Sequence, residues 1–175
     1  MSNSFSWKTK FKSIIIVDGE LFSNEYNVKL HITPHTANLK EQTEYFERLK
    51  NLFEMVFANT ITTWREEKLY HTLSKTSNNR FIELPKPPYD QIMSAVCFCK
   101  ANSVLDSVIT VSKLELSSWQ GDGITYSVDK DSKEHMIKNS TKAYTQDTLV
   151  GKQKKYQLTR STSTMLKYLS STQRF

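Results

Sequence analysis

The sequence predicts an α+β domain in which a mostly antiparallel sheet packs against one main amphipathic helix, followed by a basic C-terminal extension. Apolar and polar side chains alternate strictly over residues 26–33, which is typical of a strand with one buried face. Over residues 39–57 apolar side chains recur at spacings of three, four and seven, so one face of a helix is apolar. The pair Asp18 and Gly19 predicts a hairpin turn before the first of these segments, because glycine adopts positive φ without steric cost.

The N-terminal segment, residues 1–12, carries aromatic side chains at odd positions and lysines at even positions. The aromatic residues are Phe5, Trp7 and Phe11, and the lysines are Lys8, Lys10 and Lys12. In an extended chain this alternation gives one aromatic face and one cationic face. One interpretation is an assembly arm that anchors in a self-association or membrane interface while its lysines contact phosphates. The alternative is an edge strand whose lysines prevent unwanted pairing, and the pattern fits both.

The main helix is predicted to begin at Asn38, whose side chain can accept from the first free N–H groups, with Glu41 completing a capping box. It is predicted to end at Asn59, because the β-branched residues 60–63 disfavour a helix. Residues 64–73 fit either a short second helix or a strand.

The second half of the chain is predicted to be rich in strands. Residues 85–89 are an extended, proline-rich connector or, alternatively, a peptide-recognition motif. Residues 92–99 are apolar at both parities, which favours a buried strand, although Asp90 as an N-cap would favour a helix. Residues 104–116 and 124–128 are predicted to pair across the glycine-rich turn between them.

Positive charge is concentrated at the C-terminus. The formal net charge is +6, and the segment from residue 148 onward contains six basic residues and no acidic one. These residues are Lys152, Lys154, Lys155, Arg160, Lys167 and Arg174. We therefore expect a single domain over residues 1–147 and a basic, Ser/Thr-rich arm over residues 148–175, with both lysine-rich ends binding nucleic acid or another anionic surface.

No complete catalytic or metal-binding motif is present. His31 and Thr33 resemble one half of the two-histidine phosphoesterase signature, but no second His-x-Thr or His-x-Ser follows, so His31 is interpreted as a surface histidine. Cys97 and Cys99 lack the spacing of a zinc site and are interpreted as small buried residues. We expect no catalytic residue, no metal and no cofactor, and hence no enzyme.

The chain resembles a rhabdovirus matrix protein of the plant type in size, basicity, strand–helix–sheet order and its lysine-rich aromatic start. This resemblance implies a viral structural protein that self-associates and condenses a nucleoprotein complex, in the virion and the host cytoplasm. The partners it implies are further copies of the chain, RNA or nucleoprotein, and an anionic membrane. The alternatives are a small phage or cellular nucleic-acid-binding regulator and, less favoured, a phosphoesterase that uses His31 and Thr33.

Overall fold

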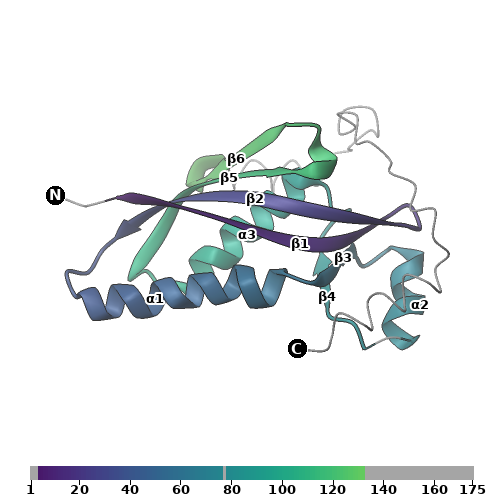
Figure 1. Ribbon diagram of the computed structural model, residues 1–175, viewed down its shortest axis with the longest axis horizontal. Coiled ribbons are helices and arrows are strands. Elements are labelled where there is room, and N and C mark those ends of the chain that lie inside the picture. The colour runs from purple at the N-terminus through teal and green to yellow at the C-terminus, as the bar shows by residue number, and fades with distance from the viewer. Residues whose placement is uncertain (1–3, 77, 133–175) are drawn as a thin grey trace.

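The computed structural model describes residues 4–76 and 78–132, and these form one six-stranded mixed sheet in the order β4-β3-β1-β2-β5-β6. The strands are β1 (Phe5–Val17), β2 (Glu20–Pro34), β3 (Thr60–Trp64), β4 (Phe81–Leu84), β5 (Ile109–Ser118) and β6 (Thr125–Asp129). The helices are α1 (Leu39–Asn51), continued by the π-helix η1 (Leu52–Phe57), then α2 (Lys68–Thr76), α3 (Asp90–Val104) and the short 3-10 turn η2 (Trp119–Gly121). Figure 1 shows the long hairpin of β1 and β2 in front of α3, with α1 along its lower side.

The hairpin of β1 and β2 organises the sheet. Its strands pair without a bulge from Phe5 opposite Ile32 to Val17 opposite Glu20. The turn is made by Asp18 and Gly19, both at positive φ, so the predicted hairpin turn is confirmed. Because side chains alternate across a strand, the hairpin presents one apolar face along its whole length and an opposite face that is polar except near the turn, where Ile14, Ile16 and Leu21 are apolar.

The main core lies between the apolar face of the hairpin and the two helices α1 and α3. The fully buried side chains Leu30, Phe53 and Met93 come from β2, η1 and α3, so all three elements contribute. The predicted start of α1 is confirmed, since Asn38 Oδ1 accepts hydrogen bonds from the backbone N–H groups of Lys40 and Glu41. Within the described residues, no helix is long and apolar enough to cross a membrane.

The predicted fold class, one main helix against an antiparallel sheet, is wrong in two respects. First, β3 pairs in parallel with both β1 and β4, so the sheet is mixed. Second, residues 92–99 belong to the helix α3, which covers the same sheet face as α1. The buried side chains Met93, Cys97 and Ala101 recur every four residues, and this helical spacing outweighs the strand propensity of the segment.

The unit β3-α2-β4 extends the sheet beyond β1 and settles the ambiguity of residues 64–73 in favour of a helix. Ser13 Oγ lies 2.7 Å from Thr62 Oγ1 and donates to the Thr60 carbonyl at 3.0 Å, which ties β1 to β3. Ile16, Ile61 and Leu73 form a second, smaller apolar cluster with α2. Since Ile16 points away from the main core, α2 covers the opposite face of the sheet near the hairpin turn.

Of the remaining strands and connections predicted from sequence, some are confirmed and one is wrong. The predicted pairing across the glycine-rich turn is confirmed by the antiparallel strands β5 and β6. Residues 104–108, expected in a strand, instead end α3 and form a turn in which Asp106 and Ser107 have positive φ. Residues 85–89 connect β4 to α3. The predicted arm, residues 148–175, lies outside the described residues.

We predict that Asn102→Ala destabilises the domain by about 1–3 kcal/mol, because it leaves the partly buried backbone groups of Val111 unpaired. Asn102 in α3 donates to the Phe98 and Val111 carbonyls and accepts from the Val111 N–H, which joins the helix to β5. Urea denaturation measures the change. Its neighbour Ser103 bonds only within the helix, to Lys100, so Ser103→Ala should change the free energy of unfolding by less than about 0.5 kcal/mol. Equal effects of the two variants would contradict the prediction.

Candidate functional site

A cluster of buried polar side chains lies where β2, β5 and the first turn of α3 meet. We call it the Asp90 cluster, and its members are Asn24, Tyr26, Asp90, Ser118 and Gln120. Tyr26 and Ser118 are direct neighbours across the pairing of β2 with β5. The Ser118 hydroxyl donates to Asp90 Oδ2 at 2.7 Å, which fixes the carboxyl group against the sheet. Every member is buried, and Asn24 and Tyr26 are 0% exposed.

Three polar atoms of the Asp90 cluster are buried without a hydrogen bond of good geometry among the described residues, although the Asn24 side chain lies close enough to the Tyr26 hydroxyl to lower the Tyr26 pKa. They are Asn24 Nδ2, the Tyr26 hydroxyl and Asp90 Oδ1. Each such atom costs about 1–3 kcal/mol of stability, and folded proteins pair nearly all of their buried polar groups. A local departure from this rule is characteristic of functional sites, where stability is given up for binding or chemistry.

The electrostatics of the Asp90 cluster disfavour negative charge. Burial raises the pKa of Asp90, and the hydrogen bond from Ser118 opposes this shift only in part. Burial also raises the pKa of Tyr26, and the nearby Asp90 carboxylate raises it further. The pKa of Tyr126 on β6 is raised in the same way, by burial and then by Asp90. A ligand that donates hydrogen bonds to Asp90 would pair the carboxylate oxygen Oδ1, for which the described residues provide no donor.

The short turn η2 covers the Asp90 cluster. The Gln120 backbone N–H donates to Asn24 Oδ1 and the Gln120 side-chain amide donates to the Ser23 carbonyl, both at 3.2 Å. A Cβ atom on Gly121 would lie 2.4 Å from Asp90 Oδ2, so only glycine fits at this position. The turn is therefore packed directly onto the carboxyl group, while its first residue, Trp119, remains 58% exposed.

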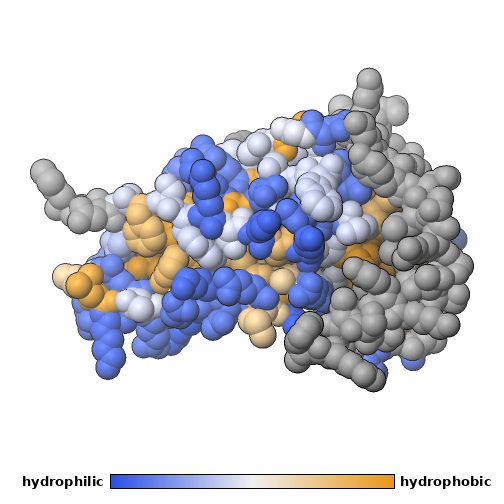
Figure 2. All heavy atoms as spheres, in the orientation of Figure 1, coloured by the Kyte–Doolittle hydropathy of each residue, from blue (hydrophilic) through white to orange (hydrophobic). Residues whose placement is uncertain are grey.

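The open face of the sheet, opposite α1 and α3, is polar and mostly basic. We call it the lysine face. It carries Lys8, Lys10 and Lys12 from β1, Lys29 and His31 from β2, and Lys113 from β5, together with the carboxylates of Glu25, Glu115 and Asp129. Figure 2 shows hydrophilic side chains, in blue, across the middle of β1 and β2. The three N-terminal lysines predicted to bind an anionic surface are thus brought together with two further lysines and His31.

The aromatic residues predicted for self-association or membrane contact lie on the other face of β1. Phe11 is 3% exposed and its ring stacks on Tyr26 at 4.9 Å between centroids. The Trp7 ring packs edge-on against Phe46 and Phe53. Phe5 is partly exposed and packs against Phe46. Within the described residues, Phe5, Trp7 and Phe11 therefore pack over α1 and η1, and their predicted role in self-association or membrane contact stays a prediction.

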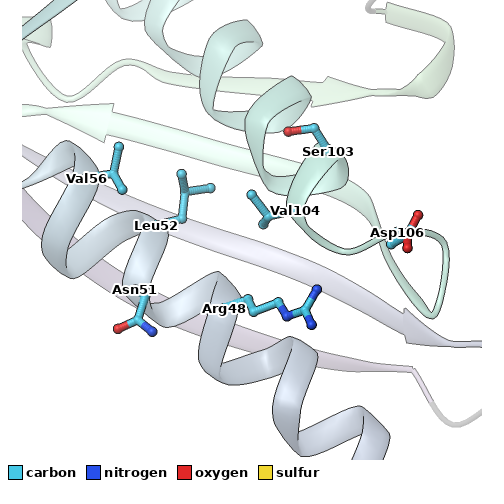
Figure 3. A pocket seen from close by; sticks show the side chains of 7 residues that line it. All are labelled: Arg48, Asn51, Leu52, Val56, Ser103, Val104 and Asp106. Atoms are coloured by element: carbon cyan, nitrogen blue, oxygen red, sulfur yellow. The ribbon is translucent and has the colours of Figure 1, made fainter.

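A groove of about 500 Å³ lies between η1 and the end of α3 (Figure 3). Leu52, Val56 and Val104 give it an apolar floor, and Arg48 and Asp106 lie at its rim. Arg48 is engaged by Glu44, one helical turn away. Asp106 follows the last turn of α3 and Asp90 begins the first, so the groove is separate from the Asp90 cluster.

His31, the one histidine considered for phosphoester chemistry, lies on the lysine face with its Nε2 3.4 Å from Glu115 Oε1. Thr33 lies two residues on, and its hydroxyl is 3.2 Å from that of Ser4. No group of three or more metal-binding side chains occurs in the described part of the chain. The six basic residues predicted from position 148 onward lie outside the described residues.

The Asp90 cluster was missed by the sequence analysis, although it leaves a weak signal. Asn24 has the same parity as Tyr26 and the buried residues that follow it on β2, so a polar side chain falls on the apolar face. Asp90 was interpreted only as a helix cap. In the structure it is the first residue of α3, and its side chain turns to Ser118 on β5.

Comparisons with known proteins give a likeness of fold. No protein-family model and no curated protein matches the sequence. A crystal structure of an uncharacterized protein from Wolinella succinogenes is similar, with a TM-score of 0.54, 10% sequence identity, and coverage of 74% of this chain and 99% of that chain. At this identity the similarity shows a shared fold and nothing about activity.

Two enzyme structures are also similar, at lower scores. One is 6-pyruvoyl tetrahydropterin synthase from Plasmodium falciparum, with a TM-score of 0.46, 14% identity, and coverage of 74% of this chain and 98% of that one. The other is the synthase from Plasmodium vivax, with a TM-score of 0.45, 9% identity, and coverage of 73% and 97%. We draw nothing about this chain's activity from scores below 0.5.

The comparisons correct the predicted function. The solved structure that is similar at a TM-score of 0.54 is a bacterial protein and not a viral matrix protein, so the description as a viral structural protein is wrong. This similarity does not support the small regulator or the phosphoesterase either. The misleading features have a simple physical origin, since a hairpin with one buried face produces the same alternation of aromatic and basic side chains.

We predict that Asp90→Asn makes the protein more stable than the wild type at neutral pH. Because burial raises the pKa of Asp90 in the folded state, its stabilising contribution is complete below its ordinary value of 3.8 and is lost as the pH rises through the folded pKa. The stability difference should therefore widen as the pH rises from about 4 to 7, by up to about 1.4 kcal/mol for each unit by which the pKa is raised. Urea denaturation across this range measures it, and parallel stability curves for the two proteins would contradict it.

Proposed function

We propose that this chain binds a small polar ligand at the Asp90 cluster, through a ligand edge that carries N–H donors beside a carbonyl acceptor. The observation that supports this is the buried Asp90 Oδ1, which has no hydrogen-bond partner among the described residues, next to the poorly paired Asn24 amide and Tyr26 hydroxyl. Asn24 and Tyr26 lie on β2, beside the carboxyl group of Asp90 on α3, and burial raises the pKa of that carboxyl group. A ligand that pairs with all three would remove a cost that the free protein carries.

The hydrogen-bonding character of the three atoms defines the ligand class. Asp90 Oδ1 accepts hydrogen bonds, Asn24 Nδ2 has two N–H groups to donate, and the Tyr26 hydroxyl can donate or accept. The complementary edge therefore has N–H groups facing the carboxylate and a carbonyl oxygen facing the amide. A 2-amino-4-oxopyrimidine ring has this edge, and hydrogen bonds to a charged carboxylate contribute about 1.5–3 kcal/mol each.

The first turn of α3 adds to the same site. Tyr89 is the N-cap residue of α3, and its side chain makes no hydrogen bond to the helix. The first backbone N–H groups of α3 are therefore without a side-chain cap. These groups and the positive end of the helix dipole favour the ionised form of Asp90 once a ligand has offset its burial. Ligand binding should thus lower the pKa of Asp90 toward its ordinary range.

Access to the Asp90 cluster requires displacement of η2, because the three atoms are enclosed. Among the described residues, two hydrogen bonds of Gln120, to Asn24 and to Ser23, connect this turn to β2. The next two residues, Asp122 and Gly123, both have positive φ, which makes the segment a tight turn after η2. The proposal assigns binding to the cluster and no reaction, and the absence of enzyme activity stays a prediction.

The test uses isocytosine, the simplest 2-amino-4-oxopyrimidine, as the probe. We expect it to raise the thermal unfolding midpoint of the full chain, with the logarithm of its concentration above the dissociation constant, because it binds only the folded state. The variant Asp90→Asn should bind at least about tenfold more weakly, since it loses a charge-assisted hydrogen bond. The analogue 4-pyrimidinone, which lacks the amino group, should also bind more weakly to the wild type.

The matched control is Asp106→Asn, which removes a carboxylate just beyond the other end of α3 and should bind isocytosine as the wild type does. Isothermal calorimetry gives the dissociation constants. The proposal is wrong if isocytosine binds Asp90→Asn and the wild type equally, or if neither is stabilised by isocytosine at millimolar concentration.

A further inference from the structure

We propose that the lysine face binds single-stranded nucleic acid, with the exposed Trp119 ring as a stacking platform at one end. This inference is independent of the ligand proposed for the Asp90 cluster. It rests on the charge balance of the open sheet face, on the register of its lysines and on the position of one aromatic ring, and it assigns the chain no viral role.

The lysine face holds more cations than its carboxylates neutralise. Five lysines share it with three carboxylates, so its formal charge is positive even with His31 neutral. Glu25 lies 3.8 Å from Lys10 and 3.6 Å from Lys12, so two ammonium groups share one carboxylate. Glu115 is likewise shared, lying 3.6 Å from Lys29 and 2.8 Å from Lys113.

The register of β1 and β2 places two of these cations directly opposite each other. Lys8 pairs with Lys29 across the hairpin, and Lys8 makes no ion pair in the described part of the chain. Like charges directly opposite each other destabilise a sheet. A phosphate between the two ammonium groups would convert this repulsion into two favourable contacts, so the pair is suited to an anion.

The lysines follow one line along β1. Lys8, Lys10 and Lys12 alternate with core residues, and at about 3.4 Å per residue they span roughly 14 Å. Their neighbours on the same face include Ser6, Asn27 and Ser117, which are polar and uncharged. A row of cations with one shared carboxylate, Glu25, fits a chain of phosphates better than a single compact anion.

Trp119 distinguishes nucleic acid from other anions. Its ring is 58% exposed, and the Lys12 ammonium group lies 5.7 Å from the ring centroid. An exposed aromatic ring beside a row of lysines is the arrangement on which unpaired bases stack while their phosphates contact cations. Binding to a lipid surface would require apolar side chains that insert into it, and the line from Lys8 to Lys12 has none on this face.

The experiment measures fluorescence anisotropy of labelled oligouridylate of about 15 nucleotides with the full chain, over a range of salt concentrations. The test variant replaces Lys8, Lys10 and Lys29 by glutamine. It leaves Lys12 beside Glu25 and Lys113 beside Glu115, so no carboxylate loses its last cation. The slope of log affinity against log salt should fall by about 2, because about three phosphate contacts are lost.

The matched control replaces three exposed lysines on the helices, Lys40, Lys68 and Lys100, by glutamine and changes the net charge equally. Its salt slope should stay near that of the wild type. In addition, Trp119→Ala should weaken binding about tenfold, and Trp119→Phe should restore most of it, because stacking contributes about 1–3 kcal/mol per base. Thermal unfolding of each variant verifies that the fold is intact.

Three results would overturn the proposal. The first is an equal loss of slope in the two lysine variants, which would mean that net charge alone governs binding. The second is unchanged binding of Trp119→Ala together with equal affinity for duplex RNA, which would exclude stacking of unpaired bases. The third is an effect of the lysine substitutions on binding to phosphatidylserine vesicles without any effect on oligouridylate, which would assign the surface to lipid.

Discussion

The two-residue period of the hairpin is the constraint on which the rest of the structure depends. Because β1 and β2 pair in one unbroken register, successive side chains of each strand lie on opposite faces of the sheet. One face is covered by α1, η1 and α3 and holds the main core, whereas the other is covered only near the turn, by α2. A slip of one residue would exchange Phe11 for Lys12 in the core, so both proposed sites follow from this register.

Local signals were sufficient to predict the hairpin, the Asn38 cap and the pairing of β5 with β6, because each depends on residues close together in sequence. The helix α3 was not predictable in this way, since its segment is apolar at both parities and only packing against the sheet selects the helix. The parallel pairing of β3 with β1 and β4 was missed for a similar reason. Their pairing requires the crossover through α2, which leaves no mark in either strand.

The candidate sites differ in how visible they are from sequence. The lysine face was anticipated in part, because Lys8, Lys10 and Lys12 alternate within one strand. The Asp90 cluster was not, since Ser118 lies 28 residues from Asp90 and Gln120 lies 96 residues from its partner Asn24. Contacts at such separations arise only when strands from both ends of the described chain meet. A polar residue such as Asn24 at a buried parity is the available signal.

The strand order also determines which strands form the exposed edges of the sheet. The two longest strands, of 13 and 15 residues, lie inside the sheet, and its edges are strands of 4 and 5 residues. A long exposed strand is a template on which other chains aggregate, and a short one offers few free backbone groups. The β3-α2-β4 unit thus shields the hairpin from intermolecular β-pairing, and a shortened chain without it would be prone to precipitate even with its main core intact.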